Sequence, residues 1–239
     1  MRARFFTPRT EAGFVGHATV AAHHVLSALP DAPQSLRQKS KAGIAEIEVR
    51  GDGEQRKIAI RRNPPPLGRE LNDRERLAVL DALALATDDL DTRCPLRIAG
   101  ANSTRLLIGV RSVEALNHLK PDMVRLTTLS AQVGAAGYFV FTLAPGSKDH
   151  LTEARMFCPA LGIAEDPVSG NAHGLLGAYL IQNGLLAHDR HRASFRGVQG
   201  RWVHRPGQVE VELEMTGGTV SGVWIIGQAV SVFQTEMTL

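Results

Sequence analysis

The sequence of 239 residues has only two cysteines, Cys94 and Cys158, and only 5% aromatic residues. Two thiols cannot cross-link a chain of this length, so a disulfide framework does not hold the fold. No stretch approaches the roughly 18 apolar residues that span a membrane, and residues 1–8 are typical of a strand rather than of a signal peptide. These absences predict a cytoplasmic protein with no membrane partner.

Charge of one sign is also scarce, because the formal net charge is only +3. The arginines are scattered, and no run of five basic residues forms a phosphate-binding stripe, so nucleic acid is not an expected partner. The small basic excess is compatible with a small anionic metabolite as the partner. Hydrophobic residues make up 44% of the chain, and with so few aromatics the core must consist of Leu, Val, Ile and Ala.

Hydrophobic periodicity predicts interleaved helices and strands with antiparallel pairing. Apolar and polar residues alternate over 43–50 and 56–61 on either side of Gly51-Asp52-Gly53, which is typical of a hairpin. Asn72-Asp73-Arg74-Glu75 resembles a capping box and places a helix start there. Hairpins among helices favour the α+β class over a doubly wound parallel sheet. Further strands are expected at 96–99, 105–110, 138–143, 154–157, 209–215, 220–226 and 229–233, and further helices at 121–133 and 170–183.

Another helix is predicted to begin at Gly16-His17-Ala18-Thr19 and to be stopped by Pro30. Helical spacing places a set of apolar residues on one face of this helix. The members of this face are Ala18, Ala21, Ala22, Val25 and Leu29.

One pattern of residues occurs twice in the chain. Arg4-Phe5-Phe6-Thr7-Pro8 recurs as Arg155-Met156-Phe157-Cys158-Pro159. An acidic residue follows each copy, Glu11 in the first and Glu165-Asp166 in the second. A chance match of a common strand–loop–helix pattern is the alternative, but several features recur in the same order, which favours a true repeat.

Each copy then reaches a Gly-polar-Ala step that opens a helix, Gly16-His17-Ala18 in the first and Gly170-Asn171-Ala172 in the second. Duplicated units commonly pack about a pseudo-two-fold axis, which would point both helix N-termini into one cleft. A helix N-terminus offers unpaired N–H groups and about half a positive charge. Such a cleft suits a small substrate that carries a carboxylate.

The two motifs resemble the two signatures of the PhzF family of phenazine-biosynthesis-like proteins, and in particular its YddE-type branch. The first signature corresponds to residues 4–8, Glu11 and residues 16–19, and the second to residues 165–172. Later segments at 197–201 and 226–230 also fit, so the resemblance spans essentially the whole chain.

The resemblance implies the α+β fold of diaminopimelate epimerase, in which two pseudo-symmetric halves each wrap a sheet round a central helix. The expected halves are residues 1–94, N-terminally incomplete relative to the family, and residues 95–239. Whether the last strand returns to the first half is left open, as is the formation of a homodimer.

The resemblance also implies a cofactor-independent isomerase, because PhzF itself moves a proton on a dihydro-hydroxyanthranilate without a metal or an organic cofactor. His17 and Asp166 match the catalytic histidine and aspartate of the family. Gly16, Gly170 and Asn171 match substrate-binding positions, although PhzF itself has serine where Asn171 stands. We therefore expect proton transfer on a small anionic metabolite, with no metal site.

The catalytic glutamate of the family lies in a Ser-Glu-Thr segment ahead of the first signature, and this sequence begins after that point. A positioned general acid/base typically contributes about 10²–10⁴-fold to a rate. The expectation is therefore that this chain, as given, is a poor isomerase.

Each candidate residue has a simpler structural role as its alternative. His17 and Asn171 could merely cap their helices, and Asp166 could bond its own backbone in a turn. Glu11 could replace the missing base, although a solvated loop glutamate is favoured. Cys158 is expected to be a buried structural thiol. A metal site is disfavoured because no third ligand accompanies the helical histidines His23, His24 and His173.

Two other functions stay open at this point. The chain could be a catalytically inactive relative that binds a metabolite or a protein partner, or it could be a racemase or epimerase of an amino or hydroxy acid. The cysteine-based epimerases carry thiols at their helix starts, where this chain has His17 and Asn171. That difference disfavours two-thiol chemistry here.

Overall fold

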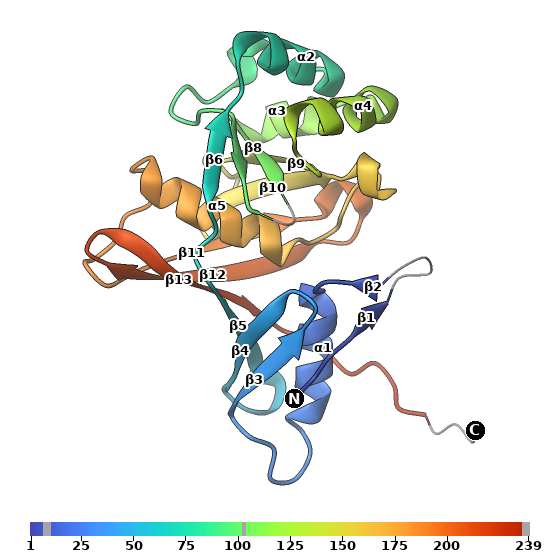
Figure 1. The fold of residues 1–239 in the computed structure, drawn as a ribbon, viewed down its shortest axis with the longest axis vertical. Helices are drawn as coiled ribbons and strands as arrows, with labels where there is room; N and C mark the ends of the chain where they lie inside the picture. Colours follow the sequence, from blue (N-terminus) through green and yellow to red (C-terminus); the bar gives the residue numbers. More distant parts are fainter. Residues whose placement is uncertain (7–10, 102–103, 236–239) are drawn as a thin grey trace. The chain divides into compact units, whose positions relative to one another are not determined.

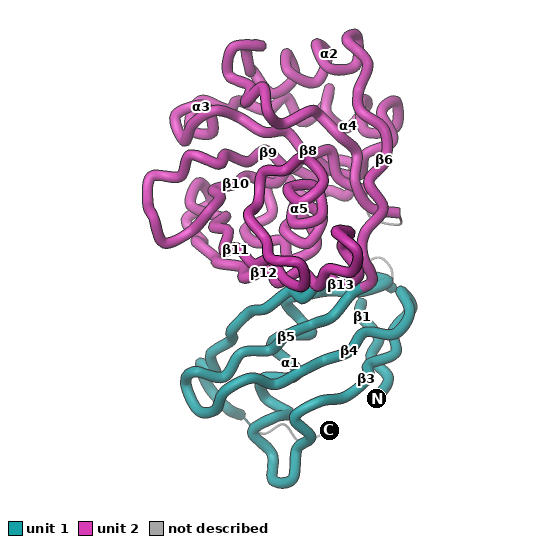
Figure 2. Tube along the Cα trace, turned by 90° about the vertical axis from the view of Figure 1, so that its left-hand side faces the viewer, with its two compact units in different colours: residues 1–62, 224–239 teal, residues 63–223 magenta. Residues whose placement is uncertain are grey.

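The computed structural model describes residues 1–6, 11–101 and 104–235, and the chain divides into two compact units (Figure 2). Unit 1 comprises Met1–Arg62 with Trp224–Leu239, and unit 2 comprises Asn63–Val223. Both units combine strands with helices, and most of the strand pairs are antiparallel. The α+β class expected from the sequence is therefore confirmed.

Unit 1 is a small antiparallel sheet that packs against a helix (Figure 1). Its strands follow the order β3-β4-β5-β13. The predicted hairpin is present, with Glu46 opposite Arg61 and Val49 opposite Ile58. Its elements are β1 (Phe5–Phe6), β2 (Glu11–Ala12), α1 (Gly16–Leu26), β3 (Ser35–Ser40), β4 (Gly43–Arg50), η1 (Gly53–Gln55), β5 (Lys57–Arg62) and the end of β13 (Thr219–Gly227).

Helix α1 begins at Gly16 as predicted but buries a different face. Thr19 and His23 are buried, whereas Val25 is 58% exposed. The two polar side chains tolerate burial because each has a hydrogen-bond partner. Thr19 Oγ1 donates to the carbonyl of Val15 at 2.9 Å, and His23 Nε2 lies 2.8 Å from Gln38 Oε1. The apolar residues that share a face with Val25 therefore do not form the buried face of the helix.

Unit 2 is built on the strands that follow the order β13-β12-β11-β10-β9-β8-β7-β6. The pairs β8–β9 and β10–β11 are parallel, and β6–β7, β7–β8, β9–β10 and β11–β12 are antiparallel. Its elements are β6 (Leu67–Glu70), α2 (Asp73–Leu83), η2 (Thr87–Asp89), β7 (Arg97–Ala99), β8 (Arg105–Val110), α3 (Val113–His118), α4 (Met123–Val133), β9 (Tyr138–Thr142), β10 (Thr152–Phe157), η3 (Pro159–Leu161), α5 (Gly170–Gln182), β11 (Arg192–Gln199), η4 (Arg201–Val203) and β12 (Gly207–Thr216).

The middle strands of unit 2 are buried on both faces, which explains why β8 and β9 are apolar at nearly every position. Alternate side chains point to opposite faces. Tyr138 belongs to the core cluster that α2, α3 and α4 cover. Phe139 and Phe141 pack against α5 instead, with ring centroids 5.2 Å from His173 and 6.0 Å from Tyr179.

Helix α5 is the central helix of unit 2 (Figure 1). All residues from 172 to 180 are buried, and the helix contacts β6, β8, β11 and β12. This arrangement is the sheet wrapped round a central helix that the resemblance implied. Although α5 is apolar all round, neither it nor any other helix in the described ranges is long and apolar enough to cross a membrane.

Several elements differ from the sequence-based expectation. Periodicity did not predict β3, β6, α3 or β11. Residues 229–233 were expected to form a strand, but they form none, and Val230 and Phe233 are 86% and 81% exposed. An alternating apolar pattern becomes a strand only where a neighbouring strand satisfies its N–H and C=O groups.

The compact units do not coincide with the expected halves 1–94 and 95–239. Residues 63–94 group with the chain up to Val223, because Leu80, Leu83 and Leu90 pack into the same core cluster as Tyr138. The end of β13 groups with unit 1. The compact units do not test whether the expected halves are related by pseudo-symmetry, so the division into two pseudo-symmetric halves stays a prediction.

Candidate active site

The sequence repeat is also a repeat of side-chain geometry. Arg4 donates from Nε to Glu11 Oε1 at 3.0 Å and from Nη2 to Oε2 at 3.1 Å. Arg155 forms the same two bonds with Glu165, at 3.1 Å and 2.8 Å. Each arginine thus closes the loop that leads from its strand toward a helix. Thr7 and Pro8 of the first copy lie outside the described residues.

Both arginines also lie over the aromatic ring two residues further along the chain. The guanidinium of Arg4 is 4.8 Å from the Phe6 ring centroid, and that of Arg155 is 5.0 Å from the Phe157 centroid. The position of the ring beside the arginine follows from strand geometry, because the side chains of residues i and i+2 point to the same face of a strand. Three equivalent residues with the same contacts in each copy make a chance match implausible, so we interpret the two segments as copies of one structural unit.

The two copies differ in burial. The side chains of Arg155 and Glu165 are each 10% exposed, whereas Arg4 is 55% exposed. Arg155 is further held by the carbonyl of Leu116, which accepts from Nη1 at 3.0 Å. The Arg4 pair lowers the pKa of Glu11, chiefly through the hydrogen bond from Arg4. A carboxylate stabilised in its ionised form is a weak base, so Glu11 is poorly suited to act as a general base.

Asp166 lies in the loop between β10 and α5, directly after the arginine-bound Glu165. Its backbone N–H donates to Met156 O at 2.9 Å. Its Oδ1 accepts from Val168 N at 3.3 Å, which is the turn bond that was the structural alternative for this residue. An ionised carboxylate has about four acceptor positions, so it can accept more than one hydrogen bond.

The start of α5 holds the two predicted substrate-binding residues of unit 2. Ser169 is the N-cap, and its Oγ accepts from Ala172 N at 3.3 Å. Gly170 and Asn171 are the first two residues of the helix, so Asn171 is not the cap, and its side chain lies on the exposed surface. Asn171 therefore does not cap the helix. A Ser immediately before an apolar helix is a cap signal that the sequence analysis missed.

The start of α1, in unit 1, holds two further predicted site residues, Gly16 and His17. The N-cap is Val15, which offers no side-chain bond to the helix. Gly16 and His17 follow in the first turn, and His17 is exposed. His17 is therefore not a cap either. Gly16 and His17 lie in unit 1, and Asp166, Gly170 and Asn171 lie in unit 2, so their convergence on one substrate stays a prediction.

One buried titratable group lies just inside the α5 start. His173 is fully buried, and its Nδ1 is 2.8 Å from Ser169 O. Because a carbonyl only accepts, the neutral ring carries its hydrogen on Nδ1. Burial lowers the pKa of His173 to about 4. A Cβ on Gly197 would lie 2.5 Å from Nε2 of His173 and 2.7 Å from Thr152 Oγ1, so glycine is needed there.

The two thiols show no catalytic features. Cys94 and Cys158 are both buried and unpaired, which confirms the expectation of a buried Cys158. Burial raises the pKa of Cys158, the nearby charge of Asp166 raises it further, and Arg105 opposes both. A thiol is a nucleophile only as the thiolate. Among the described residues, no three His, Cys, Asp or Glu side chains gather closely enough to hold a metal ion.

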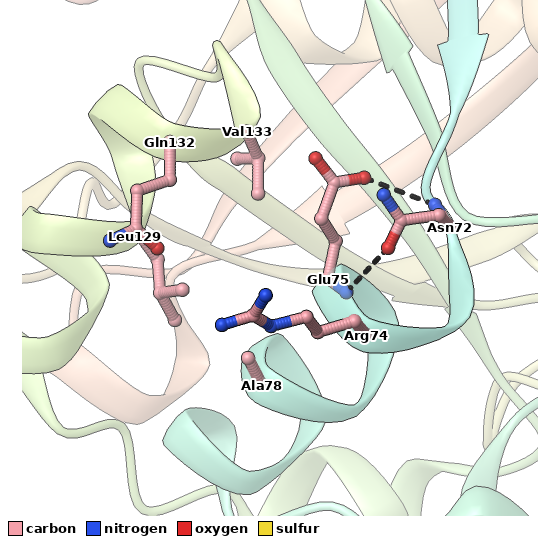
Figure 3. A pocket seen from close by; sticks show the side chains of 7 residues that line it. All are labelled: Asn72, Arg74, Glu75, Ala78, Leu129, Gln132 and Val133. Carbon is pink, nitrogen blue, oxygen red and sulfur yellow. Dashed lines mark hydrogen bonds between the residues drawn. The ribbon is translucent and has the colours of Figure 1, made fainter.

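A surface cavity of about 350 Å³ lies elsewhere in unit 2, between α2 and α4 (Figure 3). Its polar wall is the predicted capping box, in which Asn72 and Glu75 each bond the other's backbone. Arg69 also engages both oxygens of Glu75, at 2.6 Å each. These groups satisfy one another, and none of the predicted site residues lines this cavity. We therefore do not interpret it as the active site.

Comparison with known proteins decides the family. The model of the phenazine biosynthesis-like proteins, PhzC-PhzF, matches residues 1–235. The chain belongs to this family. It is 35% identical over 240 residues to an uncharacterized isomerase, YddE, of Salmonella typhimurium, covering 100% of this chain and 80% of that protein. It is 35% identical over 237 residues to an uncharacterized isomerase of Clostridium acetobutylicum, covering 99% and 78%.

Solved structures agree with this assignment. The PhzF-family phenazine biosynthesis protein of Bacillus anthracis superposes with a TM-score of 0.85 at 26% identity, covering 100% of this chain and 80% of that chain. A predicted epimerase of Pseudomonas aeruginosa gives 0.75 at 26% identity, covering 95% and 75%. The diaminopimelate-epimerase-like α+β fold expected from the motifs is thereby confirmed.

The unequal burial of the two arginine pairs in this PhzF-family chain generates a prediction. Arg155→Met should lower the free energy of unfolding by about 3–5 kcal/mol, because it leaves Glu165 as an uncompensated buried charge. Arg4→Met is the matched control and should change it far less, because its pair is solvated. Urea denaturation of both variants measures the difference. Equal effects would contradict the assigned burial.

His173 generates a prediction on pH. The folded protein keeps this ring neutral down to about pH 4, whereas the unfolded chain protonates it near pH 6.5. Stability should therefore be lost as pH falls from about 6.5 toward 4, by up to roughly 3 kcal/mol from this group alone. His173→Asn keeps a donor for Ser169 O but cannot titrate. Its unfolding free energy, measured by urea denaturation, should fall less steeply over that window, and parallel curves would contradict the assignment.

Proposed function

We propose that the chain is an isomerase that moves a proton on carbon of a small carboxylate-bearing metabolite, without a metal or an organic cofactor. The observation that carries this proposal is the duplicated arginine-closed loop that ends at a helix N-terminus. It supplies a histidine in one copy and an aspartate in the other. Membership in a family whose relatives are named isomerases supports the same reaction class.

The chemistry needs a group that accepts and returns a proton and a means of stabilising the charge that develops on the substrate. We assign proton transfer to His17 and Asp166. The backbone N–H groups of Gly16 and Gly170 belong to the first turns of α1 and α5, where the positive end of each helix dipole favours a carboxylate. Asn171 adds an amide that can donate to an oxygen of the substrate.

An amino-acid racemase or epimerase that uses two thiols finds no support in these residues. Such chemistry needs two accessible thiolates, and the pKa of Cys94 is raised to about 11 while that of Cys158 is also raised, in both cases chiefly by burial. The acid/base pair of the proposal is instead His17 and Asp166. A relative that only binds a metabolite would keep the helix N-termini but would not need the aspartate, so Asp166 separates the two functions.

The role of Asp166 is tested by Asp166→Asn. This change preserves shape and one acceptor oxygen but removes the charge and the proton-accepting role, so turnover should fall at least about 10²-fold with folding retained. Incorporation of solvent deuterium into a panel of dihydroaromatic acids and amino acids, followed by NMR, measures turnover. Asp88→Asn, an exposed aspartate in η2, is the matched control. If Asp166→Asn turns over substrate as fast as the control variant, the role of Asp166 is only to form the turn.

The finer part of the proposal is that the 239-residue polypeptide turns over slowly. The resemblance places the family's catalytic glutamate in a Ser-Glu-Thr segment, and no such tripeptide occurs within residues 1–239. A version extended with the codons upstream of Met1 should exchange deuterium about 10²–10⁴-fold faster if they encode such a glutamate. Equal rates of the two, with that glutamate present, would place the essential acid/base within residues 1–239. The Asp166 test uses whichever version is faster.

A further inference from the structure

Gln199 is a buried amide that bonds two points of the Asp166 loop. It is the last residue of β11 and is 1% exposed. Its Nε2 donates to the carbonyl of Asp166, and its Oε1 accepts from the backbone N–H of Ser169 at 3.2 Å. The two backbone groups are an acceptor and a donor, so a single orientation of the amide satisfies both. The side chain therefore sets the separation between Asp166 and the N-cap of α5.

The neighbouring residues hold the same loop from the backbone side. Gly200 follows Gln199 with φ +87°, and a Cβ there would lie 2.4 Å from the carbonyl oxygen of Pro167. A Cβ on Gly207, at the start of β12, would lie 3.0 Å from the side chain of Val168. The loop thus sits directly against β11 and β12. It cannot shift without these strands, because a packed interior offers little room.

The opposite side of Ser169 is fixed as well. Its carbonyl oxygen lies 2.8 Å from Nδ1 of His173, and its Oγ caps the helix through Ala172 N. Gln199 engages the remaining polar group of Ser169, the backbone N–H. The same amide continues to Asp166, so it is the side chain that connects the capped helix start to the acidic residue.

We propose that Gln199 is a positioning residue that fixes Asp166 relative to the first turn of α5. The inference rests on the proposed function, in which Asp166 handles a proton and the α5 start binds the substrate. Gln199 contacts neither substrate nor proton in this role. It acts through the loop backbone, and a misplacement of about 1 Å at a reacting group can lower a rate about 10²-fold.

The chemistry of the amide suggests the variants. Gln199→Met keeps length and volume but forms neither bond. Gln199→Glu keeps the acceptor for Ser169 N–H, and its second oxygen faces the carbonyl of Asp166. When ionised, this oxygen repels that carbonyl, and when protonated, it donates to it as the amide does. Burial against a carbonyl raises the pKa of a carboxylic acid, so the protonated form of this variant is accessible at mildly acid pH.

The experiment measures kcat and KM of deuterium exchange between pH 5 and 8, in the faster of the two polypeptide versions. Gln199→Met should lose about 10–10²-fold in kcat across the whole range. At pH 8 the kcat of Gln199→Glu should be lower by the same factor. As the pH falls to 5, the ratio of its kcat to that of wild type should rise at least about tenfold. Asn183→Ala is the matched control, because it removes an amide-to-carbonyl bond at the other end of α5, to Tyr179 O at 2.8 Å. It should follow wild type.

Two kinetic outcomes would overturn the proposal: a wild-type kcat in Gln199→Met, or a ratio of the kcat of Gln199→Glu to that of wild type that does not change with pH. Should Gln199→Met not fold, Gln199→Glu carries the test alone through its pH dependence. The backbone amide NMR signals of Ser169 and Gly170 in the ligand-free protein give a second readout. They should move more in Gln199→Met or Gln199→Glu than in Asn183→Ala, and unmoved signals would refute positioning. If wild type exchanges no compound on the panel, the proposed function fails, and these signals alone decide whether Gln199 holds the loop.

Discussion

Arg155 lies on a central strand of unit 2, and its ion pair with Glu165 determines where the following loop can run. Both oxygens of Glu165 are engaged, at 3.1 and 2.8 Å from the guanidinium, so the loop returns to the strand that it left. Asp166 is the next residue, and its N–H bonds Met156 on the same strand. The pair is buried, so breaking it would leave a charge without a partner in a low-dielectric site. The position of Asp166 and the start of α5 both depend on this closure.

The rest of unit 2 supports that closure through buried polar side chains that bond the backbone of the loop. Gln199 bonds both ends of the Asp166–Ser169 loop, and His173 bonds the Ser169 carbonyl as a neutral ring. These contacts lie at the start of α5, which is buried from residue 172 to residue 180 and contacts β6, β8, β11 and β12. These bonds favour one arrangement of the loop, because a shift of Asp166 or Ser169 would break them inside the protein. Rigidity at the α5 start follows from that requirement.

The two copies of the arginine-closed loop have diverged in a way that suits a division of roles. The copy in unit 2 is buried, its helix is capped by Ser169, and it carries an aspartate. The copy in unit 1 is solvated, its helix lacks a side-chain cap, and it carries an exposed histidine. In the repeat, His17 corresponds to Asn171, whereas Asp166 follows the arginine-bound Glu165.

The sequence by itself determined the class of fold, the repeat, the family resemblance and the positions of His17, Asp166, Gly16, Gly170 and Asn171 relative to helix starts, because these depend on local patterns. It also predicted the hairpin of β4 and β5 and the capping box at Asn72, which are short-range signals. It failed where the partner is distant. The buried face of helix α1 depends on Gln38, which lies in strand β3. Residues 229–233 form no strand despite their alternating pattern. The role of Gln199 could not be inferred from sequence, because a glutamine at a strand end carries no local signal. Only the tertiary structure brings its amide to Asp166, 33 residues earlier in the chain, and hydrogen bonding requires that proximity.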